Sequence, residues 1–79
     1  MNRYHFNFRC GDQLFPDRFG MYLPSDEDAF EEAIRTGGDL SALANQTGEK
    51  HDSAIEIMDA DGTMIGTIPL GYAERLKEP

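Results

Sequence analysis

The sequence predicts an α+β fold: a two-layer sandwich in which one amphipathic helix packs on a small four-stranded, mainly antiparallel sheet, in the order β-β-α-β-β. Three observations lead to this prediction: one long segment with helical periodicity, extended segments before it, and two further extended segments after it that a hairpin turn joins. A sheet with one apolar face needs a covering layer, and the helix supplies it. The order of the strands across the sheet does not follow from the sequence.

The predicted helix covers residues 25–47, SDEDAFEEAIRTGGDLSALANQT. At about 100° per residue, its apolar side chains fall within one half of the helical wheel, and most charged ones fall on the other half. The apolar positions are Ala29, Phe30, Ala33, Ile34, Leu40, Leu43 and Ala44. Ser25 is a suitable N-cap, and Asp28 takes the place of the acid in a capping box. We therefore expect a one-faced helix that needs a partner surface.

Two adjacent glycines, Gly37 and Gly38, are the weak point of this helix, because together they cost about 2 kcal/mol relative to alanine. One interpretation is a break, with Asp39 capping a second short helix. The other is a single kinked helix. We favour the second, because the apolar positions keep the same phase before and after the glycines.

The residues before the helix predict two strands. In the first, aromatic and polar side chains alternate with the two-residue period of a half-buried strand. The aromatic residues are Tyr4, Phe6 and Phe8, and the polar ones are Arg3, His5, Asn7 and Arg9. We expect the aromatic face to meet the helix. The second strand covers residues 14–23 around a predicted turn at residues 17–20, and Pro16 makes it irregular or places it at an edge.

The residues after the helix predict a hairpin. Residues 54–58 and 63–70 read as strands, and Asp-Ala-Asp-Gly at residues 59–62 is the strongest hairpin signal in the chain. The predicted apolar faces consist of Ile55 and Ile57 on one strand, and of Met64, Ile68 and Leu70 on the other. With the first two strands, this hairpin completes the four-stranded sheet.

Composition limits the class of protein. The 79 residues indicate a single domain over residues 1–79, and the net charge of −8 argues against nucleic acid and anionic membranes as partners. No apolar run approaches the roughly 20 residues that cross a bilayer, and the first residues lack the apolar core of a signal peptide. A single cysteine, Cys10, excludes an internal disulfide. We expect a small cytoplasmic protein.

Several short motifs together resemble a known family. They are Arg-Tyr-aromatic-Phe at residues 3–6, Asp-x-x-Gly-x-x-Leu-Pro at residues 17–24, an Ala-rich helix, Ile-Glu-Ile-x-Asp-x-Asp-Gly at residues 55–62, and Thr-Ile-Pro-Leu at residues 67–70. The chain is similar, over nearly its whole length, to short bacterial proteins common in alphaproteobacteria and known only as a domain of unknown function. The resemblance implies a small cytoplasmic protein with no assigned activity. The chain departs from the family pattern at Gly37-Gly38, where relatives carry helix formers.

The sequence offers little catalytic or metal chemistry. The turn at residues 59–62 is not an EF-hand, because aligning Gly62 with the sixth loop position places Ile57 and Ile68 where oxygen ligands are required. The nitrogen and sulfur ligands are His5, Cys10 and His51. Their spacing does not match a zinc site, and nothing places a nucleophile beside a base. We expect no metal, no cofactor and no enzymatic activity.

One group of polar residues is a candidate site. Arg3, His5 and Arg9 should project together from the sheet face that the helix leaves open, in a protein that is otherwise acidic. A small anion, or an acidic patch on a partner, could bind there. The alternative is ordinary cross-strand pairing with Glu56, which should point the same way.

Two functions follow as hypotheses. The first is a non-enzymatic protein-interaction or regulatory module that uses the open sheet face or an edge strand to bind another protein or a second copy. Apolar residues left on that face, such as Ile65, would support it. The alternative is a small-anion or small-ligand binding protein that uses Arg3, His5 and Arg9. We favour the first, because the sequence does not assemble a reactive site.

Overall fold

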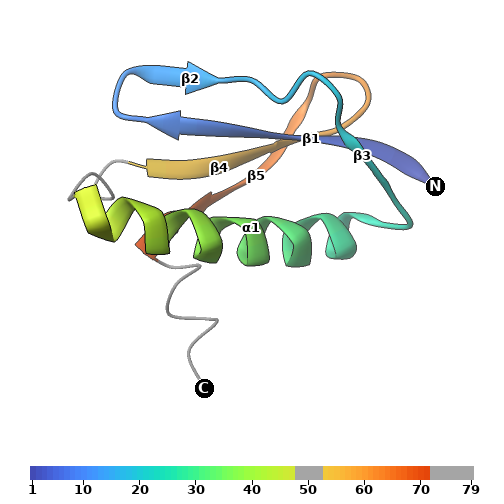
Figure 1. The fold of residues 1–79 in the computed structure, drawn as a ribbon. Helices are drawn as coiled ribbons and strands as arrows, with labels where there is room; N and C mark the ends of the chain where they lie inside the picture. The colour runs from blue at the N-terminus through green and yellow to red at the C-terminus, as the bar shows by residue number, and fades with distance from the viewer. Residues whose placement is uncertain (48–52, 72–79) are drawn as a thin grey trace.

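The computed structural model describes residues 1–47 and 53–71, and within them the chain forms one helix and a five-stranded sheet. In chain order the elements are β1 Asn2–Cys10, β2 Gln13–Phe15, β3 Met21–Leu23, α1 Asp26–Thr47, β4 Ser53–Met58 and β5 Met64–Pro69. The helix lies along one side of the sheet as a second layer (Figure 1). The predicted α+β sandwich is therefore confirmed, with one strand more than expected.

The additional strand arises because the predicted second strand is divided in two. β2 pairs with the end of β1, from Phe8↔Phe15 to Cys10↔Gln13. β3 pairs with the start of β1, from Asn2↔Leu23 to Tyr4↔Met21. Pro16 has no N–H to donate to a ladder, so the pairing stops there and resumes only after a loop at residues 16–20.

β1 is the strand on which the sheet is built. The order is β2-β1-β4-β5, with β3 also on β1, and every paired strand is antiparallel. β4 pairs with β1 from His5↔Met58 to Cys10↔Ser53. The first residues of β1, which have no partner in β4, are the ones that β3 pairs with. The order of the strands, which the sequence left open, places β2 at one edge and β5 at the other.

The turn between β4 and β5 forms at the predicted residues. Gly62 has φ +82°, the left-handed conformation that glycine adopts at least cost, and its N–H donates to the Asp59 carbonyl at 3.1 Å. The Asp59 carboxylate accepts from the Asp61 and Thr63 N–H groups, both at 2.9 Å. The Asp59 side chain thus closes the turn through local hydrogen bonds.

The helix begins with the predicted cap. The Asp28 N–H donates to Ser25 Oγ at 3.4 Å, and the Ser25 hydroxyl donates to the Asp28 carboxylate at 2.8 Å. The helix then runs through Gly37 and Gly38 without a break, and both glycines are buried. The interpretation as two helices is therefore wrong. Burial of these positions explains how tertiary packing stabilises a helix that carries two poor helix formers.

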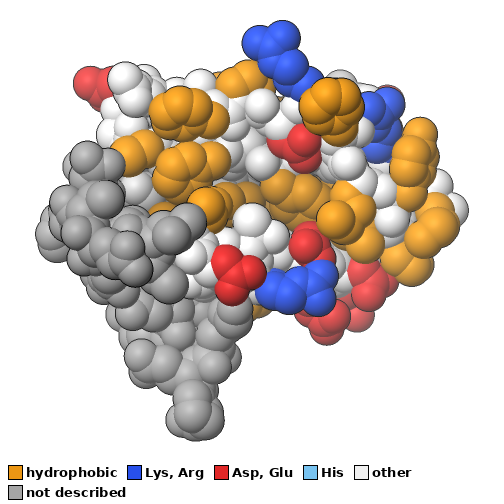
Figure 2. All heavy atoms as spheres, viewed as in Figure 1, with side chains coloured by type: hydrophobic (Ala, Val, Ile, Leu, Met, Phe, Trp, Pro, Cys, Tyr) orange, Lys and Arg blue, Asp and Glu red, His pale blue; other side chains and the backbone are white. Residues whose placement is uncertain are grey.

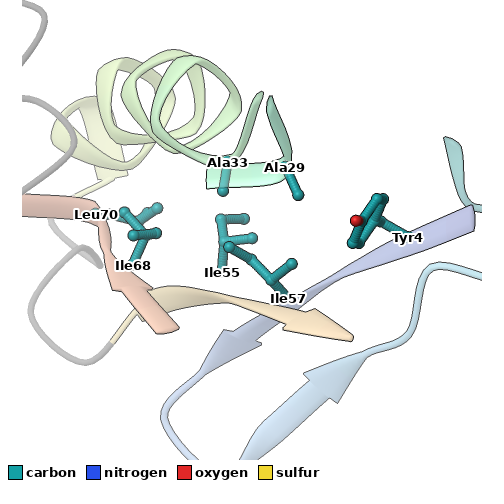
Figure 3. Packing of buried hydrophobic residues seen from close by; sticks show 7 residues of the cluster. All are labelled: Tyr4, Ala29, Ala33, Ile55, Ile57, Ile68 and Leu70. Atoms are coloured by element: carbon teal, nitrogen blue, oxygen red, sulfur yellow. The ribbon is translucent and has the colours of Figure 1, made fainter. Parts of the chain in front are cut away.

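The core lies between α1 and the sheet and consists of Tyr4, Ala29, Ala33, Ile55, Ile57, Ile68 and Leu70. Ala29 and Ala33 point from α1 toward Ile55 and Ile57 (Figure 3). Their small side chains let the helix approach the sheet closely. The side chains of Leu43 and Ala44, predicted for the same face, lie outside the described part of the structure.

The helix covers only part of the sheet. Among the strands, α1 packs chiefly on β5, β4 and β3. A helix with its side chains is about 10 Å wide and strands are about 4.8 Å apart, so one helix spans about two strands. Consequently Tyr4 is buried, whereas Phe6 and Phe8 are half-buried and pack against the edge of the core. The predicted aromatic face does meet the helix layer, but only Tyr4 is fully covered.

The predicted apolar face of β5 is correct for Ile68 but wrong for Met64, the first residue of the strand. Ile68 and Leu70 are buried, but the side chain of Met64 is 53% exposed. The reason is an irregularity in the pairing between Ile57 and Met58, which shifts the register of the start of β5. Ile65, which we expected on the open face, packs against the core instead.

Candidate functional site

The three candidate residues share one face of β1. Arg3, His5 and Arg9 occupy odd positions of the strand, so their side chains lie opposite the core residue Tyr4. The register places Arg3 beside Tyr22 of β3. It places Arg9 beside Leu14 of β2. The stripe therefore runs along the open face next to both short strands, and each of its members has a partner within the fold.

Arg9 binds Glu56 of β4. The two side chains form an ion pair in which Arg9 Nε donates to Glu56 Oε2 at 2.6 Å. This hydrogen bond and the negative charge of Glu56 raise the pKa of Arg9. The cross-strand pair with Glu56, which the sequence offered as the alternative to anion binding, is present.

Arg3 and His5 hold the loop at residues 16–20. Arg3 donates from Nε to the Phe19 carbonyl at 2.9 Å and also from Nη2 to the same oxygen. His5 Nδ1 lies 2.7 Å from the Asp17 carbonyl oxygen. A carbonyl can only accept, so Nδ1 carries the proton in this contact. Both side chains are used to fix the loop against β1.

Asp17 is the centre of this loop. Its carboxylate accepts from three backbone N–H groups: Gly20 at 3.0 Å, Phe6 at 3.1 Å and Phe19 at 3.2 Å. Its own N–H donates to Asn7 Oδ1 at 2.9 Å. Burial alone would raise the pKa of Asp17, but these N–H donors and the nearby His5 lower it. The hydrogen bonds of Asp17 thus attach the loop to the part of β1 that pairs with neither β2 nor β3.

Gly20 closes the same loop. Its φ is +73°, and a Cβ at this position would lie 2.7 Å from the Tyr4 carbonyl oxygen. Both the conformation and the space therefore require glycine. The sequence predicted a turn at residues 17–20 but missed that Asp17 binds β1 and that Gly20 lies close against it. The available signal was the Asp-x-x-Gly spacing, since aspartate accepts from backbone N–H groups a few residues ahead.

Large hydrophobic side chains are exposed along the two short strands and the loop between them. We call this set the β2–β3 surface; it consists of Leu14, Phe15, Phe19, Met21 and Tyr22. Phe19 is 84% exposed, and Tyr22 is 61% exposed. Phe15 stacks on Phe8 with ring centroids 5.9 Å apart, and the Arg3 guanidinium lies 6.0 Å from the centre of the Tyr22 ring. Figure 2 shows hydrophobic side chains gathered over the strand side of the molecule.

A hollow of about 210 Å³ lies at the start of the helix, lined by Asn2, Tyr4, Asp26, Asp59, Ala60 and Asp61. Three of its polar side chains have internal partners: the Tyr4 hydroxyl donates to Asp26 Oδ1 at 2.6 Å, and Asp59 accepts within its own turn. The bond to Asp26 and burial raise the pKa of Tyr4. Within residues 1–47 and 53–71, no group of three potential ligands could hold a metal ion.

Cys10 and His5 are not placed as a nucleophile and its base. They are five positions apart along β1, which is about 17 Å, and their side chains point to opposite faces. His5 Nδ1 is also occupied by Asp17. The remaining histidine, His51, lies outside the described residues.

The comparisons with known proteins agree with the resemblance that the motifs indicated. No curated protein and no solved structure matches the chain. In the described ranges, no helix is sufficiently long and apolar to cross a bilayer. A family model described as "Domain of unknown function (DUF6894)" matches residues 3–71, which is most of the chain. The match begins at Arg3, within β1, and includes the helix and the other four strands. The protein therefore belongs to this family of unknown function.

Proposed function

We propose that this protein is a cytoplasmic, non-enzymatic protein-interaction module that acts through the β2–β3 surface. One observation carries the proposal. Among the described residues, seven large hydrophobic side chains are exposed, and five of them fall within residues 14–22. Leu14 and Tyr22 lie on the open face, opposite Arg9 and Arg3, whereas Phe15 and Met21 lie on the other face, opposite Phe8 and Tyr4. Single exposed hydrophobic residues are common on protein surfaces, whereas their concentration in one edge segment favours a docking site.

The position of this surface at the edge of the sheet supports the proposal. β2 pairs with β1 on one side, and in the described part of the chain no strand pairs with its other side. All three residues of β2 are exposed. β2 is short and Pro16 follows it, which limits uncontrolled strand addition. This edge therefore exposes its side chains for binding but offers little backbone with which another strand could pair.

The loop that carries Phe19 is fixed before any partner arrives. Asp17 accepts from the backbone N–H of Phe19 itself, and Arg3 donates to the Phe19 carbonyl. A ring that is exposed on a fixed loop loses less conformational entropy on binding than one on a loose segment. Aromatic and arginine side chains are also enriched among residues that contribute most to binding. Tyr22 and the adjacent Arg3 are residues of these two kinds.

Support for the small-anion alternative is weaker. Arg9 is paired with Glu56, and Arg3 and His5 hold the loop at residues 16–20. An anion at the Arg3, His5 and Arg9 stripe would have to compete with these internal acceptors. The exposed hydrophobic side chains of the β2–β3 surface would also have no role in such a protein.

The proposal can be tested by position-specific photo-crosslinking in the native host. The photoreactive residue p-benzoylphenylalanine is incorporated in place of Phe19 and, as the matched control, in place of Met64, which is exposed on the opposite edge strand. We expect a discrete covalent adduct from position 19 and none from position 64. Tyr22→Ser in the first chain should reduce the adduct. Equal adducts at both positions, or none at position 19, would contradict the proposal.

A further inference from the structure

β2 is an edge strand, and in the described chain no strand pairs with its outer side. Its three residues, Gln13–Phe15, are all exposed. Leu14 points to the open face of the sheet and Phe15 to the other face, because they lie beside Arg9 and Phe8 in the register. A partner of this edge must therefore supply apolar contacts on both faces.

The backbone of β2 also presents hydrogen-bonding groups at this edge. The Phe6 N–H points toward the β2 side of β1, where it donates to Asp17. Backbone groups alternate between the two sides of a strand, so those of Phe8 and Cys10 point to β2 as well. Leu14 lies between the partners of these two residues and therefore directs its N–H and C=O away from β1. A single residue of β2 thus offers both a donor and an acceptor.

The surroundings of this edge carry balanced charge within an acidic protein. Three arginines and three acidic residues lie on β1, on β4, or in the turn and loop on either side of β2: Arg3, Arg9, Arg18, Asp12, Asp17 and Glu56. α1, which covers β4 and β5, contains six acidic residues and one arginine. The net charge of −8 opposes contact between two copies, so they meet at least cost through a balanced region such as this one.

From these observations, and resting on the proposed function, we infer that the partner of the β2–β3 surface is a second copy of this chain, whose β2 pairs with the first β2 about a two-fold axis at Leu14. Leu14 is the middle residue of β2, so this register pairs the strand along its whole length. The two Leu14 residues exchange two backbone hydrogen bonds. Pro16 has no N–H and ends the pairing, so the contact closes as a dimer.

The side chains of the two copies then match on both faces. On the open face, Leu14 lies directly opposite Leu14 of the second copy, where cross-strand side chains pack. On the other face, the two Phe15 residues become diagonal neighbours about 7–8 Å apart, which aromatic side chains can bridge. Each Phe15 ring already stacks on Phe8, with ring centroids 5.9 Å apart. A continuous row of aromatic rings therefore crosses the dimer axis.

Two other kinds of partner fit this edge less well. A longer strand of a different protein would extend past Leu14 to face Pro16, which cannot donate, so its extra length gains no hydrogen bond there. A strongly charged partner of either sign gains little net attraction from a surface whose charges balance. The contact covers only about 10 Å of strand edge, and interfaces well below about 800 Å² per partner are weak. We therefore expect a dimer that dissociates on dilution.

Sedimentation velocity over about a hundredfold range of protein concentration measures this equilibrium, and the original chain should dimerise as its concentration rises. Leu14→Lys and Leu14→Asp should each weaken dimerisation by about tenfold or more, because either change places two like charges directly opposite each other. An equimolar mixture of the two variants should dimerise again, because lysine then faces aspartate. The matched control Met64→Lys, on the other edge strand, should not weaken dimerisation.

The dependence on salt is a second measurement. Raising sodium chloride from roughly 0.01 M to 0.15 M should strengthen the dimer, because it screens the repulsion between two chains that each carry a net charge of −8. A dimer held by ion pairs between the copies would weaken instead.

Several outcomes would overturn the inference. They are an original chain that stays monomeric at the highest concentration, a mixture that dimerises no better than its two components, an equal loss in Met64→Lys, and a dimer that salt weakens. Because Leu14 is exposed, circular dichroism should show an unchanged fold in its variants. If the chain stays monomeric while the position-19 crosslink joins it to another protein, the inference fails and the proposed function stands. If the crosslink is also absent, the proposed function fails with it.

Discussion

Asp17 is the residue that determines the shape of the β2–β3 surface. Its carboxylate, N–H and carbonyl form five contacts with β1 and with its own loop. The partners are His5, Phe6, Asn7, Phe19 and Gly20. Without it, the β1 edge between β2 and β3 would lack these bonds. The Asp-x-x-Gly motif of the sequence is thus the means by which an interrupted edge strand stays attached.

Gly20→Ala should be more destabilising than the same change at another left-handed glycine. At Gly20 the new Cβ meets the Tyr4 carbonyl oxygen at 2.7 Å, whereas at Gly11, with φ +60°, nothing lies within 4 Å. We expect Gly11→Ala to lower the free energy of unfolding by about 1 kcal/mol, and Gly20→Ala by about 2–4 kcal/mol, because the steric contact adds to the conformational cost. Urea denaturation measures both. Equal losses would show that the loop moves freely away from β1.

Asp17→Asn should change how stability depends on pH. The folded protein holds the pKa of Asp17 below its ordinary value, so the stabilisation is complete above the unfolded pKa of about 3.9 and is lost as pH falls toward the lower folded pKa. The asparagine variant lacks this charge-assisted contribution, about 1–2 kcal/mol at pH 7. We therefore expect the two stability curves to converge as pH falls below about 4.

The matched control for this experiment is Glu31→Gln, a charge removal at an exposed helix position. It should leave the pH dependence of the unfolding free energy close to that of the original chain. If Asp17→Asn runs parallel to the original chain at every pH, the N–H bonds to the carboxylate do not contribute as the geometry indicates.

At the scale of the elements, local periodicity was enough to predict the helix, the first strand and the second hairpin. The alternation in β1, the Ser25 cap and the turn at Gly62 all act between near neighbours. Two features could not be predicted, because they depend on contacts between distant residues. Asp17 binds groups 10 to 12 residues earlier in the chain, and these bonds divide the expected second strand.

The second feature is the shifted register of β5. A two-residue alternation assigns Met64 to the face of Ile68, but the irregularity between Ile57 and Met58 changes that assignment and exposes Met64. The candidate site shows the same limit. The sequence placed Arg3, His5 and Arg9 on the open face, yet it offered only the pair with Glu56 as a partner and missed the contacts of the loop.

Gly66 sets the distance between α1 and β5. A Cβ at this position would clash with the ring of Phe30, so Gly66→Ala must push the ring or the helix aside. We expect a loss of about 1–3 kcal/mol in the free energy of unfolding, the usual cost of overpacking. In a Phe30→Leu background the same change should cost clearly less, because the smaller side chain leaves room. A double-mutant cycle by urea denaturation gives the coupling, and additive losses would contradict a direct contact.

At the scale of the whole molecule, two thin layers share an uneven distribution of charge and apolar surface. One helix covers β4 and β5, so the β1–β2 side keeps half-buried and exposed aromatic rings. The same helix carries most of the acidic residues of the described chain, while three of the four described arginines lie within residues 2–23.

The acidic helix should make the stability of the fold depend on salt. With a net charge of −8 and like charges close together on α1, self-repulsion disfavours the compact state, and sodium chloride screens it. Raising the salt from roughly 0.01 M to 0.15 M shortens the Debye length from about 30 Å to about 8 Å. We expect the free energy of unfolding at pH 7 to rise by up to about 1 kcal/mol.

At pH values close to the isoelectric point of 4.4, the same salt should have little effect or a reversed one, because attraction between opposite charges is then screened as well. A protein that loses stability with salt at pH 7 would instead depend on its ion pairs, Arg9–Glu56 among them, more than it suffers from repulsion along α1.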